Sequence, residues 1–134
     1  MSFDVYIQWF HDGDSQGLPE ERVRSAFGDA LKVQDDFGWR LSYGPGLESD
    51  VYVSRRDGKV EGLTVNRPVE APALWQALFD FLGVENAVFF FPGSGLFIRS
   101  IAVVRHLPPE MVEALGPPQV VSSAAALRHT LDAA

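Results

Sequence analysis

The segment from Val51 to residue 65 constrains the fold most strongly, because it has the pattern of a β-hairpin. The run Val51-Tyr-Val-Ser-Arg leads into Asp57-Gly58, and residues 60–65 return as a second apolar run. An Asp-Gly pair supplies the positive φ angles that a tight hairpin turn requires. Strands joined by such a turn pair antiparallel, so the sequence predicts a sheet with antiparallel neighbours.

Other apolar segments add strands and helices to this hairpin. Alternation over residues 3–9 predicts a first strand with one buried face. The nearly all-apolar stretch 73–82, which follows Pro72, predicts a deeply buried helix. The short apolar run 87–91 predicts a central strand that is covered on both faces.

The first strand leaves one question open. Tyr6 and Phe10 fall on the face opposite to Phe3, Val5 and Trp9. Either a helix covers this second face as well, or an apolar patch is exposed there.

The remaining segments complete an α+β pattern. Further strands are expected over residues 39–43, 96–104 and 119–121, and further helices over residues 19–27, 108–115 and 123–131. Hairpin connections outnumber strand–helix alternations. We therefore expect a single α+β domain over residues 1–134, with a mostly antiparallel or mixed sheet of about five to six strands packed by about three to four helices.

The composition excludes several classes of function. The chain has 134 residues, of which 46% are hydrophobic and 22% charged, as in an ordinary folded domain. Its net charge of −7 argues against a nucleic-acid ligand, which requires a basic surface. It has no cysteine, so disulfides, thiolate metal sites and cysteine catalysis are excluded.

The first residues do not have the pattern of a signal peptide, because they lack a basic start and Asp4 interrupts the apolar stretch. The longest apolar run, 87–91, is far shorter than the roughly 20 residues of a membrane-spanning helix. We expect a cytoplasmic protein with no membrane contact.

No catalytic motif is complete. Pro92-Gly-Ser-Gly95 lacks the spacing of a nucleophile elbow and the lysine of a phosphate loop, so it predicts a turn. His11, His106 and His129 share no short ligand spacing, and we expect each of them in a surface or capping role. The sequence therefore predicts no catalytic residue, no metal site and no cofactor.

Acidic residues concentrate in the first third of the chain and provide a candidate protein-binding surface. An acidic surface raises the association rate of a basic partner. The candidate residues are Asp12, Asp14, Glu20, Glu21, Asp35 and Asp36.

Three segments resemble parts of small bacterial proteins in their general layout. They are Leu74-Trp-Gln-Ala-Leu-Phe-Asp-Phe-Leu, Val88-Phe-Phe-Phe-Pro-Gly and Leu107-Pro-Pro-Glu-Met-Val-Glu-Ala-Leu-Gly. This layout is similar to that of small, acidic, cysteine-free bacterial proteins, some of which are immunity proteins of polymorphic-toxin systems. The resemblance implies binding to another protein, such as a toxin, through shape and charge, and it supplies no catalytic residues.

Three functions follow as hypotheses. The first is a non-enzymatic protein-binding module that acts through the acidic residues. The second is a small-ligand-binding protein or small enzyme with a pocket between the sheet and its loops; the candidate pocket residues are His11, Trp39, Tyr43 and Arg99. The third is a homodimer that forms through an edge strand or through the face with Tyr6 and Phe10.

Overall fold

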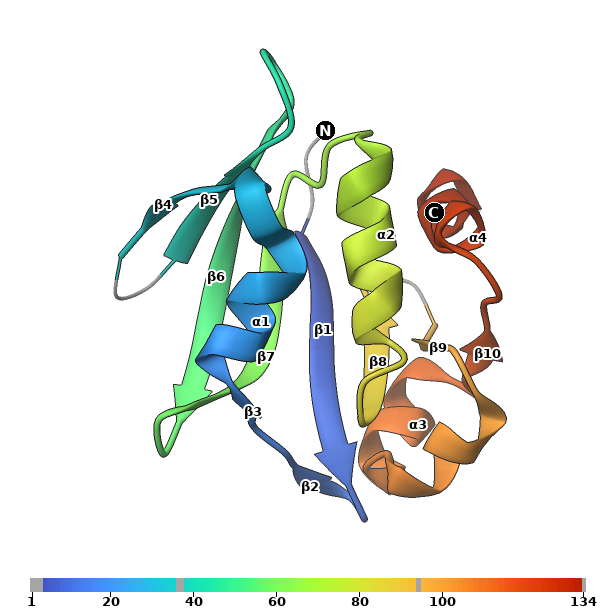
Figure 1. Ribbon diagram of the computed structural model, residues 1–134. Helices are drawn as coiled ribbons and strands as arrows, with labels where there is room; N and C mark the ends of the chain where they lie inside the picture. Colours follow the sequence, from blue (N-terminus) through green and yellow to red (C-terminus); the bar gives the residue numbers. More distant parts are fainter. Residues whose placement is uncertain (1–3, 36–37, 94, 134) are drawn as a thin grey trace.

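A twisted sheet runs through the computed structural model, which describes residues 4–35, 38–93 and 95–133 (Figure 1). The strands follow the order β10-β9-β8-β1-β7-β6-β5-β4, while β2 pairs with β1 and β3 pairs with β7. The strands are β1 Asp4–His11, β2 Asp14–Ser15, β3 Leu18–Pro19, β4 Leu31–Gln34, β5 Gly38–Ser42, β6 Glu48–Arg56, β7 Lys59–Asn66, β8 Asn86–Phe90, β9 Phe97–Ile98 and β10 Gln119–Val120.

Helices connect these strands and pack mainly on one face of the sheet. In Figure 1, α1 and α2 lie in front of the strands, and α4 lies beside α2. The helices are α1 Glu20–Phe27, α2 Pro72–Phe81, α3 Pro109–Leu115 and α4 Ala124–His129, with short 3-10 helices η1 Gly28–Ala30, η2 Ile101–His106 and η3 Thr130–Ala133.

The predicted hairpin is present as β6 and β7. Asp57 and Gly58 form its turn with φ angles of 53° and 77°, the positive values that this turn needs. The same pattern recurs between β1 and β2, where Asp12 and Gly13 have φ angles of 48° and 86°. Both hairpins pair antiparallel.

Two apolar clusters cover different parts of the sheet. We call the face of the sheet that α1 and α2 cover the inner face and the opposite one the outer face. The larger cluster lies on the inner face, where Val5, Ile7 and Trp9 of β1 are fully buried under side chains of α1 and α2. The smaller lies on the outer face, where Phe10 and Val88 pack with residues of η2 and the loops around it. Strand β8 therefore contributes to both clusters, which confirms that it is covered on both faces.

The expected α+β class is confirmed, and the sheet is mixed because β9 and β10 pair parallel whereas the other pairs are antiparallel. The expected number of strands was wrong: within the described residues, the sheet has ten strands. Strands β9 and β10 lie within two expected strands, whereas β2 and β3, with two residues each, and β4, with four, were not expected because such short segments show little periodic pattern in the sequence.

The expected strand over residues 96–104 was also wrong in its second half. Strand β9 ends at Ile98, and the chain then forms η2, in which Ser100 Oγ accepts a hydrogen bond from Ala102 N. Its β-branched residues favour a strand, but this N-cap and the packing of Val103 against the outer face override that preference. In the described residues, no helix has the length and apolar character needed to cross a membrane.

Candidate functional site

The outer face of the sheet is uncovered over β5, β6, β7 and the first half of β1, as far as the described residues show. Side chains of η2 and α3 pack only at the end of this face formed by β8, β9 and the last part of β1. We call the uncovered part the open sheet face. Its side chains are Asp4, Tyr6, Arg40, Asp50, Tyr52, Thr64 and Asn66.

A row of aromatic side chains crosses the open sheet face. In register across the strands, Phe90 pairs with Tyr6, Tyr6 with Thr64, and Thr64 with Tyr52. The rings of Tyr6 and Phe90 stack with their centroids 5.3 Å apart. Tyr52 is 50% exposed, the largest aromatic exposure among the described residues. The row thus presents aromatic surface to solvent at Tyr52, whereas Phe90 at its other end packs against the smaller cluster.

Gly38 of β5 lies directly opposite Tyr52 in the cross-strand register, and its lack of a side chain makes room for the ring of Tyr52. A Cβ atom at Gly38 would come within 3.3 Å of Tyr52 Cδ1 and 2.9 Å of the Val51 carbonyl oxygen. The ring therefore extends over the glycine backbone on the neighbouring strand. An aromatic side chain that covers a cross-strand glycine is a known device for holding register in sheets.

A second row of the open sheet face is polar and paired within itself. Asn66 Nδ2 donates a hydrogen bond of 2.7 Å to Asp4 Oδ1, and Arg40 Nε donates one of 3.1 Å to Asp50 Oδ1. The hydrogen bond with Asp50 raises the pKa of Arg40. The row is therefore ordered before any partner binds, which lowers the entropic cost of binding.

A groove of about 370 Å³ lies where these two rows meet the edge of the sheet. Gly38, Arg40, Asp50 and Tyr52 line it from the open sheet face, and Val33 lines it from β4. Val33 is 54% exposed. The groove brings together Tyr52 and Arg40, residue types that are enriched at protein interfaces.

The structure places the predicted acidic residues in several elements. Asp12 and Asp14 lie at the turn from β1 to β2, and Glu20 and Glu21 lie in the first turn of α1. Asp35 follows β4 and its carboxylate accepts a hydrogen bond from Gly38 N. Asp36 lies outside the described residues.

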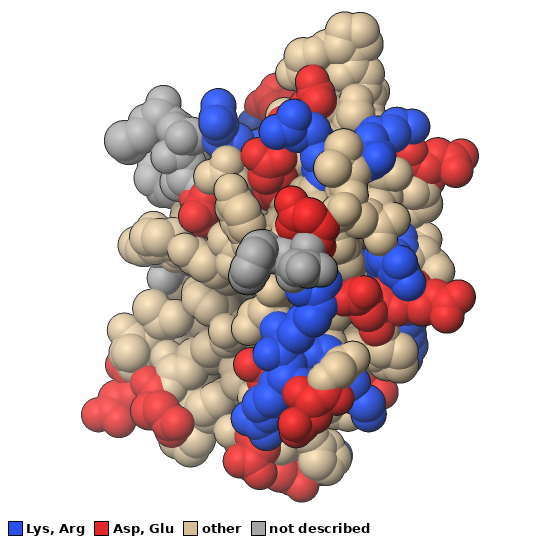
Figure 2. All heavy atoms as spheres, turned by 90° about the vertical axis from the view of Figure 1, so that its left-hand side faces the viewer, with Lys and Arg blue, Asp and Glu red and all other residues tan. Residues whose placement is uncertain are grey.

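Basic side chains accompany these carboxylates. Arg55 Nε lies 2.5 Å from Glu20 Oε1. Figure 2 shows Lys and Arg side chains interspersed with Asp and Glu over the side of the molecule that carries β4 and β5. The acidic residues of the first third do not dominate the charge of this surface.

The predicted pocket residues lie in different parts of the sheet. Trp39 is buried on the inner face, where its ring packs against Phe27, and Tyr43 packs against the same cluster. Arg99 lies over the ring of Phe79, with 4.3 Å from its Cζ to the ring centroid. His11 ends β1, three strands away from β5 in the sheet order. The structure shows no single pocket that these four residues share, within the part of the chain that it describes.

His11 instead lies beside His106, a pair that the sequence spacing did not suggest. Their rings stack with centroids 5.2 Å apart. The carboxylate of Asp12 contacts both rings: Oδ2 lies 3.3 Å from His11 Nε2, and Oδ1 lies 3.3 Å from His106 Nδ1. His106 is only 8% exposed, so of the two roles expected for it, at the surface or as a cap, the surface position was wrong. Its Nδ1 accepts a hydrogen bond from Asp12 N, and its carbonyl oxygen accepts one from Gly13 N.

These contacts give His106 a structural role, since it satisfies two backbone N–H groups of the β1–β2 turn. Its other ring nitrogen, Nε2, lies 3.1 Å from Arg105 Nε, so both ring nitrogens of His106 have a partner within the chain. In the described residues, no three His, Asp or Glu side chains are arranged to hold a metal ion.

Sequence reasoning missed the main residues of the open sheet face, Arg40, Asp50 and Tyr52. The signal was present in part, because Tyr52 alternates with Val51 and Val53 and therefore had to lie on the opposite face of its strand. Nothing in the alternation indicates whether a helix covers that face.

Comparisons of the chain with protein-family models, with curated protein sequences and with solved structures found no match.

Proposed function

We propose that this chain is a non-enzymatic protein-binding module, of the kind that immunity proteins represent, and that its open sheet face holds a basic protein partner. The observation that carries the proposal is the exposed Tyr52, which lies opposite Gly38 and next to the Arg40–Asp50 pair. Tyrosine and arginine are the residue types most enriched among the side chains that dominate binding energy at protein interfaces.

The order of the open sheet face supports a protein as the ligand. The face is formed by strand residues whose positions are held by the cross-strand register, and its polar row is internally hydrogen bonded. Such a surface binds without large rearrangement. It extends over several strands, which suits a macromolecular partner better than a small molecule.

Charge supports a basic partner. The chain carries a net charge of −7. Around the open sheet face, three carboxylates, of Asp4, Glu48 and Asp50, accompany the two guanidinium groups of Arg40 and Arg67. The face itself offers charges of both signs, and the net charge of the whole molecule raises the association rate of a basic partner.

The test starts by capturing a partner on the immobilised protein from a lysate of the source organism, identifying it by mass spectrometry and purifying it. Calorimetric titrations then compare the wild type with Tyr52→Ala. A central interface residue contributes at least about 2 kcal/mol, so we expect affinity to fall about 30-fold or more. We also expect the association rate of the wild type to fall as salt rises.

Val120→Ala provides a matched control, because Val120 is 53% exposed on the opposite edge of the sheet. It should leave affinity unchanged. The acidic residues are tested by replacing Asp12, Asp14, Glu20 and Glu21 together with their amides. If this variant loses the partner while Tyr52→Ala keeps it, binding belongs to the acidic residues and the proposal for the open sheet face is wrong.

A further inference from the structure

A second candidate site lies on the other side of the molecule, in a groove of about 540 Å³ between α2 and α4. Its apolar part is formed by Pro72, Trp75 and the two alanines Ala124 and Ala125. A groove of this size is within the usual range for small-molecule sites. We call it the α2–α4 groove; it shares no residue with the open sheet face.

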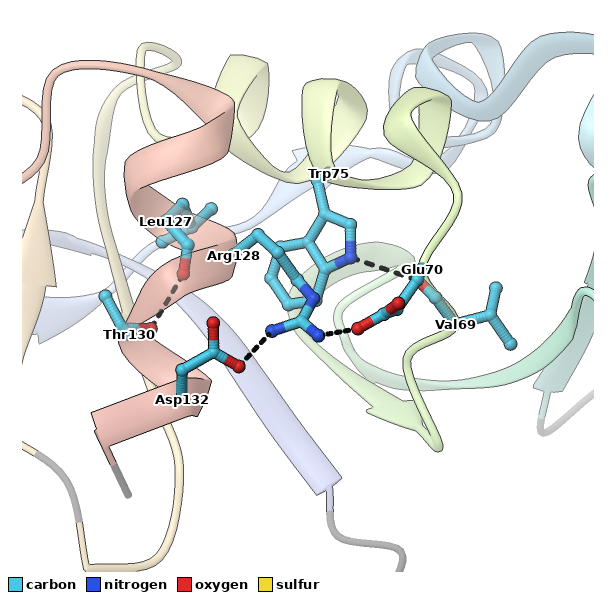
Figure 3. A network of polar contacts seen from close by, with 7 residues as sticks. All are labelled: Val69, Glu70, Trp75, Leu127, Arg128, Thr130 and Asp132. Atoms are coloured by element: carbon cyan, nitrogen blue, oxygen red, sulfur yellow. Dashed lines mark hydrogen bonds and ion pairs between the residues drawn. The ribbon is translucent and has the colours of Figure 1, made fainter.

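The groove exists because α4 packs on α2 through only part of its surface. Leu127 is fully buried beneath α4, whereas Ala124 and Ala125 at its start are too small to fill the space toward α2. The ring of Trp75 is held in place because its Nε1 donates a hydrogen bond of 3.0 Å to the Val69 carbonyl oxygen (Figure 3). The ring is only 3% exposed, and Arg128 Cζ lies 5.9 Å from its centroid, so Trp75 forms a fixed and nearly buried base of the groove beneath Arg128.

One arginine and two carboxylates lie together at this groove. Figure 3 shows the guanidinium of Arg128 between Glu70 and Asp132, with one nitrogen directed at each carboxylate. Arg128 Nη1 donates a hydrogen bond of 3.0 Å to Asp132 Oδ1, and Nη2 contacts Glu70 Oε1. The three side chains together carry one net negative charge.

The two carboxylates are positioned to accept more donors. Each uses one oxygen for Arg128, which leaves Oε2 of Glu70 and Oδ2 of Asp132 without a hydrogen-bond donor among the described residues. Their side chains are 74% and 63% exposed, whereas that of Arg128 is 23% exposed. A ligand that enters the groove therefore meets carboxylate oxygens rather than an available guanidinium.

We propose that the α2–α4 groove binds a small organic cation, a primary ammonium or guanidinium group on an apolar body. The apolar body lies against Pro72, Ala124 and Ala125, and the cationic group donates hydrogen bonds to the free oxygens of Glu70 and Asp132. An organic anion is excluded, because it would have to separate Arg128 from both carboxylates.

The test uses three probes with similar apolar bodies and different charges: phenethylammonium, phenethyl alcohol and 3-phenylpropionate. Each is titrated to millimolar concentration into the full chain labelled with ¹⁵N, and the indole N–H signals of its three tryptophans are followed. A Trp75→Phe variant assigns the relevant signal. We expect phenethylammonium to shift the Trp75 signal with saturation, at an affinity about tenfold or more above that of the other two probes.

Variants locate the cation. Glu70→Gln combined with Asp132→Asn should weaken phenethylammonium about tenfold or more, whereas Glu110→Gln on α3 and Tyr52→Ala on the open sheet face should leave it unchanged. The spread of amide chemical shifts in the ¹⁵N spectrum of each variant shows whether that variant is folded. Equal binding of the three probes, tighter binding of the anion, or an unshifted Trp75 signal would each overturn the proposal.

Discussion

The two faces of the sheet differ although they are formed by the same strands. On β1, the inner residues Val5, Ile7 and Trp9 are fully buried, whereas Tyr6 on the outer face is half-buried. Phe10 lies on the same outer face as Tyr6 and yet is buried. The difference between Tyr6 and Phe10 arises from the connection after β9, which folds η2 and α3 over only one end of the outer face.

This comparison teaches that alternation assigns a side chain to a face but does not determine what lies above that face. An aromatic residue on a strand becomes part of a core when a helix or loop covers it, and part of a potential binding surface when nothing does. The open sheet face is the part of the sheet that no described helix or loop covers.

The largest expected effect separates the inner face from the outer face on β1. Trp9→Ala should lower the free energy of unfolding by about 4–5 kcal/mol, because it removes a fully buried ring that packs edge-on against Phe81. Gln8→Ala, one residue earlier and on the outer face, should cost less than about 1 kcal/mol. Urea denaturation of both variants measures the difference, and equal losses would contradict the assignment of faces.

The next comparison separates the covered from the open part of the outer face. Phe10→Ala should cost about 3 kcal/mol, because the smaller cluster around it loses a buried ring. Tyr6→Ala should cost about 1 kcal/mol, since it mainly loses the stacked contact with Phe90. The same denaturation experiment applies. If Tyr6→Ala were as costly as Phe10→Ala, the open sheet face would not be open.

A smaller effect concerns pH and the inner face. Tyr43 packs against the inner cluster, and burial raises the pKa of its phenol to about 12. Because the raised pKa means that the fold favours the neutral phenol, its contribution is intact below about pH 10 and is lost as the pH rises toward 12. Absorbance of the phenolate should show a late step near pH 12, and Tyr43→Phe should remove it. Complete ionisation of the tyrosines near pH 10 would contradict this.

Much of the architecture was predictable from local pattern. The β6–β7 hairpin followed from Asp57-Gly58, and the buried helix α2 followed from Pro72 and the apolar run after it. Strands β2, β3 and β4 were not predicted, because segments of two to four residues show little periodicity, and η2 was not predicted because its β-branched residues favour a strand. Strand β10 lies within the strand expected over residues 119–121, but only the tertiary structure decided its parallel pairing with Phe97 and Ile98.

The candidate sites were predictable to a lesser degree. The acidic residues and the pocket residues were chosen from composition and residue type, and the structure distributes both sets over several elements. The Arg128 network depends on Glu70 and Asp132, and Glu70 lies 58 positions from Arg128 in the chain. No spacing rule reaches across such a separation.

The sequence by itself determined the α+β class, the antiparallel hairpins and the side of each strand on which a residue lies, because turn chemistry and periodicity act over a few neighbouring residues. Only the tertiary structure decided which of those sides are covered. Coverage depends on where η2, α3 and α4 pack, and that packing follows from contacts between segments far apart in the chain. The open sheet face and the α2–α4 groove are both consequences of that packing.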